Sequence, residues 1–93
     1  MRFEKLEQNI IDMIKEEQAK LGYRKESIRL YYPLSSLVHL TGENLGEQEM
    51  LALLSEFGEE TKEPLGGVTV TAKKDRFCFL IPEEGVVYVK EHT

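Results

Sequence analysis

Apolar side chains recur with a helical period over the first 21 residues of the chain. At 100° per residue, seven apolar residues between Phe3 and Leu21 fall on one arc, and most of the charged residues fall on the opposite side. Gly22 follows directly, and glycine is the residue that most often ends a helix. The pattern therefore predicts an amphipathic helix from about Phe3 to Leu21.

The period changes to two over residues 27–32. Apolar or aromatic residues at the even positions alternate there with Arg29 and Tyr31, which predicts a short strand. Pro33 supports this prediction, because proline disfavours helical backbone angles at the residue before it. Pro33 and the two serines after Leu34 are typical of a helix start, so a second, short helix is expected to run to about Gly42.

A third helix is predicted from about Glu47 to Phe57, closed by Gly58. One side of this helix is apolar and would face the core. The apolar stripe consists of Met50, Leu53, Leu54 and Phe57. The other side carries Glu49 and Glu56 and offers no Lys or Arg.

The period of two returns after a loop that contains proline and glycine. Residues 68–73 and 76–81 both alternate between two faces and are separated by Lys74 and Asp75. If these two residues form a tight turn, every pair of side chains on one face is apolar, which favours a β-hairpin in this register. The expected pairs are Ala72 with Phe77, Val70 with Phe79 and Val68 with Ile81.

A further strand is predicted over Val86–Lys90, after a turn through Pro82 and Gly85. In this register the sheet shows a second apolar surface to solvent, which is typical of a protein interface. That candidate interaction surface consists of Cys78, Leu80, Val87 and Val89. We expect either a partner or a second copy to cover it, or else the first helix or strand of the same chain. A bulge at Gly85 would alter the register.

The elements together have the order α-β-α-α-β-β-β in a single domain over residues 1–93. This α+β order resembles a winged helix-turn-helix domain, in which three helices pack with a small antiparallel sheet. The resemblance implies that the third helix lies in a DNA groove and that the hairpin forms the wing. The stretch from Tyr23 to Leu37 also resembles a family of short uncharacterised bacterial proteins, which implies no activity.

The charge distribution argues against the usual activity of a winged helix. The chain carries a net charge of −5, and residues 43–63 alone carry −6 from seven glutamates and Lys62. This acidic segment contains the predicted third helix. Because phosphate contacts dominate nucleic-acid affinity, we expect an acidic helix at that position to repel DNA.

Two basic groups are candidates for nucleic-acid contacts away from that helix. One surrounds the predicted first strand, where cations alternate with tyrosines as in proteins that bind single strands. The other lies at the tip of the predicted hairpin. The candidate contacts are Lys20, Arg24, Lys25, Arg29, Tyr31, Lys73, Lys74 and Arg76. A solvated helix end and tyrosines that pack into the core would explain the first group equally well.

Residues suited to catalysis are few. Ser35, His39 and Glu43 lie four residues apart on one side of the predicted second helix, but a short exposed helix supplies neither an oxyanion hole nor a pocket. His39 and Glu43 are fewer ligands than a metal site needs. We therefore expect no enzymatic activity, no metal and no cofactor.

The composition also bears on the cellular compartment and on which function to expect. The charged start of the chain is unlike a signal peptide, and no apolar run approaches the roughly 20 residues of a membrane span. The single cysteine cannot form an internal disulfide. We expect a cytoplasmic bacterial protein that makes no membrane contact. A protein-interaction or self-association module is the principal hypothesis, and nucleic-acid binding is the alternative.

Overall fold

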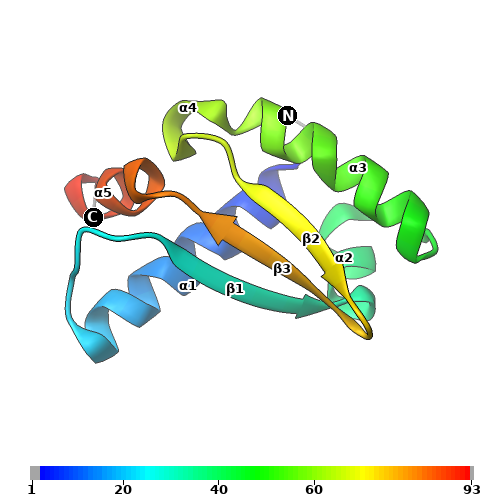
Figure 1. The fold of residues 1–93 in the computed structure, drawn as a ribbon, viewed down its shortest axis with the longest axis horizontal. Helices are drawn as coiled ribbons and strands as arrows, with labels where there is room; N and C mark the ends of the chain where they lie inside the picture. Colours follow the sequence, from blue (N-terminus) through cyan, green and yellow to red (C-terminus); the bar gives the residue numbers. More distant parts are fainter. Residues whose placement is uncertain (1–2, 93) are drawn as a thin grey trace.

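The computed structural model describes residues 3–92, which form an α+β fold of five helices and one three-stranded antiparallel sheet (Figure 1). The elements are α1 (Glu4–Leu21), β1 (Ile28–Pro33), α2 (Leu34–Thr41), α3 (Glu47–Glu60), α4 (Lys62–Leu65), β2 (Thr69–Lys73), β3 (Arg76–Ile81) and α5 (Glu83–Glu91). The predicted α+β class is confirmed. The predicted order is also confirmed as far as β3, apart from the short helix α4, which lies where the proline and glycine residues predict a loop.

Strand β3 is the centre of the sheet, with β1 on one side and β2 on the other (Figure 1). The hairpin of β2 and β3 has the predicted register around its two-residue turn, in which Lys74 has a positive φ of 38°. Its inward pairs are Ala72 with Phe77 and Val70 with Phe79. The first strand pairs with β3 in antiparallel register, so a segment from the front of the chain completes the sheet.

The hydrophobic core lies between the inner face of the sheet and the helices. Alternation along β3 turns three large side chains toward this core. These are Phe77, Phe79 and Ile81, and α1 supplies Leu6, Ile10 and Ile14. Edge-to-face rings join the layers, with centroids 6.2 Å apart for Phe57 and Phe79 and 5.4 Å apart for Phe3 and Phe57. Leu21, predicted on the apolar arc, is 73% exposed because the last turn of α1 extends beyond the sheet (Figure 1).

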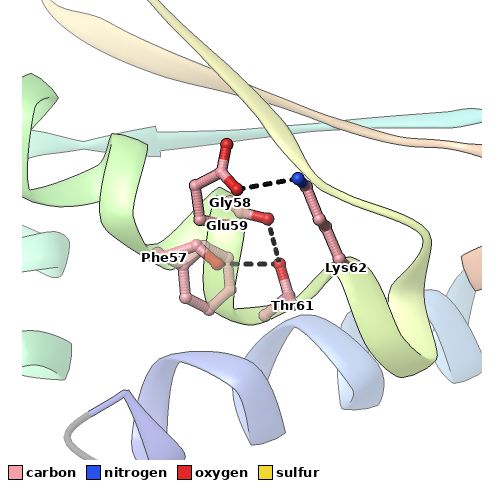
Figure 2. A network of polar contacts seen from close by, with 5 residues as sticks. All are labelled: Phe57, Gly58, Glu59, Thr61 and Lys62. Atoms are coloured by element: carbon pink, nitrogen blue, oxygen red, sulfur yellow. Dashed lines mark hydrogen bonds and ion pairs between the residues drawn. The ribbon is translucent and has the colours of Figure 1, made fainter.

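Gly58 allows α3 to lie very close to the segment that leads into β2. A Cβ atom at this position would lie 2.4 Å from the carbonyl oxygen of Val68. Contrary to the prediction, Gly58 does not close the helix, which continues to Glu60. The buried Thr61 hydroxyl then donates to the carbonyl oxygens of Phe57 (2.8 Å) and Gly58 (3.3 Å), as Figure 2 shows. These hydrogen bonds give partners to two carbonyl oxygens in the last turn of α3, where the helix lies against the segment that leads into β2.

The predicted strand over Val86–Lys90 is wrong, because these residues belong to α5. Strand β1 already occupies the side of β3 away from β2, so no pairing position beside β3 is left for a later strand. Pro82 and two glutamates in the first turn begin the helix, where carboxylates interact favourably with the helix dipole. The helix contacts α1 and α4, and it buries Val86 and Val89 one helical turn apart.

We predict that Gly58→Ala lowers the free energy of unfolding by about 1–3 kcal/mol, the usual cost of overpacking. In an ordinary helix the same substitution should raise the free energy of unfolding by about 1 kcal/mol, because alanine favours a helix over glycine. A decrease would therefore report the close approach to Val68. Ser55→Ala, on the exposed face of the same helix, is the control and should change stability by less than about 0.5 kcal/mol. Urea denaturation followed by circular dichroism measures both. A Gly58→Ala variant as stable as the wild type would contradict the close approach to Val68.

We also predict that Tyr32 makes the fold sensitive to alkali. Burial raises the pKa of this tyrosine to about 12, and its hydroxyl donates to Asn9 Oδ1 at 2.7 Å. The unfolded chain releases the same proton near pH 10, so stability should fall as the pH rises from about 10 to 12. Tyr32→Phe should flatten that fall while costing about 1 kcal/mol at neutral pH for the lost hydrogen bond. Thermal melts across this pH range would refute the assignment if the two proteins lost stability in parallel.

Candidate nucleic-acid interface

The face of the sheet turned away from the core is crossed by no helix of residues 3–92 (Figure 1). Residues paired across neighbouring strands point to the same side, so the two registers place nine side chains on this face. The three rows are Arg29–Leu80–Thr69, Tyr31–Cys78–Thr71 and Pro33–Arg76–Lys73. Seven of the nine are exposed, and we call this surface the outer sheet face.

Four cations from separate parts of the chain meet at this face. Arg29 comes from β1, Lys73 from β2 and Arg76 from β3, while Lys74 lies in the turn between the last two strands. The carboxylate of Asp75 lies beside them, 3.7 Å from Arg76 Nε, but both side chains remain largely exposed. These five residues together carry a charge of +3. The face is therefore locally basic on a chain that is acidic as a whole.

Tyr31 is the aromatic side chain of this basic face. It is 49% exposed, and the guanidinium carbon of Arg76 lies over its ring, 5.9 Å from the centroid. Tyr31 and Arg76 line one depression in the surface together with the three residues 73–75. Cys78 pairs with Tyr31 in the central strand and is 5% exposed. The ring thus stands in a row with a short, buried side chain and has cations around it.

The remaining basic candidates lie elsewhere and have carboxylate partners. Lys20, Arg24 and Lys25 occupy the last turn of α1 and the loop that follows it, and their nearest acidic atoms lie at 2.9, 3.9 and 3.8 Å. Those partners are Glu16, Glu26 and Glu83, respectively. Lys20 Nζ donates a hydrogen bond to Glu16 Oε1, and this bond raises the pKa of the exposed lysine. The basic candidates therefore fall into two groups. Only the second group, Arg29, Lys73, Lys74 and Arg76, lies with Tyr31 on the outer sheet face or in its turn.

The acidic segment faces solvent on α3, away from the outer sheet face. Glu47, Glu49, Glu56, Glu59 and Glu60 are all exposed there, and none belongs to the strands or to the turn between β2 and β3. Lys62, the cation within this segment, forms an ion pair of 2.9 Å with Glu59 (Figure 2). Acidic and basic groups are therefore separated onto two surfaces of one small fold.

Comparison with known protein families shows a match that spans nearly the whole sequence. A family model described as a domain of unknown function, DUF3877, with a gene description from E. rectale, matches residues 3–93. The chain belongs to the DUF3877 family. The expected resemblance to an uncharacterised bacterial family is confirmed by this match. No curated protein and no solved structure matches the chain.

The predicted apolar interaction surface is not formed in this DUF3877 chain. Val87 and Val89 stand on α5 rather than on a strand beside Cys78 and Leu80, so the four residues do not share one face. Cys78 and Val89 are buried, and Leu80 and Val87 are half-buried. In place of the two valines, β1 lies next to β3 and brings Tyr31 and Arg29 to this face.

The predicted row on the second helix is only partly brought together. Ser35 and His39 line a shallow depression between α1 and α2 that also contains Asn9 and the Tyr32 ring, whereas Glu43 is not among its lining residues. Within residues 3–92, no three His, Cys, Asp or Glu side chains come close enough to hold a metal ion. The helices of the same part of the chain are also too short or too polar to cross a membrane.

The sequence indicates the cations and Tyr31 as candidates but does not place them on one surface. The missing information was the pairing of β1 with β3, which brings residues 29–31 beside residues 76–80. The small residues of the same face, Thr69 and Thr71, were also not recognised as part of a site. The available signal was the alternation along residues 28–32 and 76–81, which indicates strands but not their pairing.

Proposed function

We propose that this protein is a nucleic-acid-binding module that uses the outer sheet face and the β2–β3 turn. The observation that supports the proposal is that Arg76 lies over the exposed ring of Tyr31 and that two lysines line the same depression. Arg29 stands two residues from Tyr31 on the same face of β1. These side chains come from three strands and a turn, and all four cations are exposed. A surface of this kind matches a polyanion that carries aromatic bases.

The overall negative charge of the chain does not oppose this proposal at contact distance. At physiological ionic strength, interactions between exposed charges are screened beyond about 8 Å, so the local charge decides the binding of a phosphate. The outer sheet face and its turn carry +3, whereas the chain carries −5. We therefore expect binding that depends strongly on salt and an association rate that gains little from long-range attraction.

Helix α3 has the wrong chemistry for the role that a winged helix usually gives it. Its exposed side carries Glu49 and Glu56, and Gln48 is the one side chain there suited to reading a base edge. Insertion into a groove would bring both carboxylates toward phosphates. The proposed contact surface is therefore the sheet and the wing, which can bind without this helix.

We predict that Lys73→Glu/Lys74→Glu/Arg76→Glu weakens binding at least tenfold. Fluorescence anisotropy with labelled 20-nucleotide single strands and duplexes, from 50 to 200 mM salt, measures the loss. Four phosphate contacts on a single strand correspond to a slope of roughly −3 in log K against log salt, and removal of three should make it shallower by about 2. The reason is that each lost contact between a cation and a phosphate leaves one more counterion bound to the nucleic acid.

The matched control is Lys20→Glu/Arg24→Glu/Lys25→Glu. Both triple variants change the net charge from −5 to −11, because each substitution removes a positive charge and adds a negative one. The control residues lie in the last turn of α1 and the loop that follows it, outside the outer sheet face, so we expect affinity within about threefold of the wild type. Equal weakening by both triples would indicate a general charge effect. Absence of wild-type binding at 50 mM salt would reject the proposal.

A protein-interaction module without catalysis is the second candidate function. The observation that favours it is that one chain carries a basic outer sheet face and an acidic α3 surface, which are complementary between copies. Such a head-to-tail contact is heterologous, so it would form open assemblies more readily than a closed dimer.

We predict for this candidate that assembly grows with protein concentration at low salt and is lost in Lys73→Glu/Arg76→Glu. Both substitutions replace the attraction for the glutamates of α3 with repulsion. Light scattering at several concentrations measures the effect, and the Lys20→Glu/Lys25→Glu variant serves as the control. A wild-type protein that stays monomeric throughout would remove this candidate and leave nucleic-acid binding unaffected.

A further inference from the structure

We infer that Tyr31 stacks on an unpaired base, so that the preferred ligand is single-stranded nucleic acid rather than a duplex. This inference rests on the proposed function and names its ligand class. It starts from the contrast between two neighbouring tyrosines that occupy opposite faces of β1.

Tyr32 is fully used by the fold, whereas Tyr31 is not. The Tyr32 ring meets Phe79 edge-to-face at 5.2 Å, and its hydroxyl donates to Asn9. The Tyr31 side chain is half exposed, and the guanidinium carbon of Arg76 lies over its ring, 5.9 Å from the centroid. A large aromatic side chain that contributes little to the core presents its ring to a ligand.

The surroundings of Tyr31 suit a strand of nucleotides. Arg29 lies two residues away on the same face, about 6.6 Å along the strand, and Arg76 and Lys73 form the next row on the other side. Phosphates on either side of a stacked base therefore meet cations. The exposed Thr71 and the buried Cys78 complete the row of Tyr31, and the depression that the ring lines opens toward residues 73–76.

Stacking on an exposed ring selects for unpaired bases. In a duplex both faces of each base are covered by its neighbours, and a side chain on a flat sheet cannot reach them without disrupting the stack. An unpaired base has a free face, and every base has one, so the contact does not depend on sequence. The four cations would bind the phosphates of either form, which leaves Tyr31 as the residue that distinguishes them.

The test compares Tyr31→Ala and Tyr31→Phe on three probes of equal length. The probes are a labelled oligothymidine, the same strand with abasic sites throughout its centre, and a duplex; an oligouridine distinguishes RNA from DNA. Tyr31→Ala should weaken binding to the intact strand roughly 5- to 150-fold, the range for loss of one stacked base. Tyr31→Phe keeps the ring and should stay within about twofold of the wild type.

The abasic strand isolates the stacking contribution. The wild type should bind the abasic strand about as weakly as Tyr31→Ala binds the intact strand. On the abasic strand itself, the wild type and Tyr31→Ala should have the same affinity. Tyr23→Ala is the control, because Tyr23 is a second exposed tyrosine whose ring lies 5.7 Å from Lys90 Nζ, outside this face. It should leave all affinities unchanged.

The outcomes separate this inference from the proposed function. If the wild type binds single strands and the wing triple variant does not, but Tyr31→Ala binds as tightly as the wild type, the stacking role is wrong and the proposed function stands. Tighter binding of the duplex than of the single strand also overturns the inference. If the wild type binds none of the probes, both fail together.

Discussion

The pairing of β3 with a strand on each side is the constraint on which the rest of the structure depends. The side chains of any strand alternate between the two faces of the sheet, and pairing on both sides of β3 aligns its alternation with that of β1 and β2. Phe77, Phe79 and Ile81 fill the core on one side. The residues between them are thereby turned to the other side, beside Tyr31 and Arg29 of β1. The core and the candidate interface are the two faces of the same three strands.

The same arrangement explains how an acidic chain can have a basic face. The glutamates of residues 43–63 belong mainly to α3, whose buried stripe turns their side chains to solvent. The cations belong to the outer face of the sheet and to the turn of the hairpin. Because each element exposes only the side opposite the core, the acidic segment 43–63 and the cations of the strands and the turn lie on separate surfaces. Net charge is therefore a poor guide to what this fold can bind.

Local patterns predicted most of the fold, and their failures have physical causes. The hairpin register followed from the sequence because every inward pair is apolar. The valines of residues 86–89 favoured a strand, yet the sheet had no free position beside β3, and tertiary packing outweighed β propensity. The role of Gly58 depends on the carbonyl oxygen of Val68, which no periodicity reveals. The cations of the site were identified individually, but their convergence depends on the long-range pairing of β1 with β3.

The position of Tyr31 is secured by residues of the core on the opposite face of β1. A shift of one residue in the pairing of β1 would exchange its two faces, burying Tyr31 and Arg29 and exposing Leu30 and Tyr32. The buried contacts of Tyr32 with Phe79 and Asn9 oppose that shift. The core therefore fixes which tyrosine faces solvent. The contacts of Tyr31 lie outside that core, so its substitution can change binding while the register stays as it is.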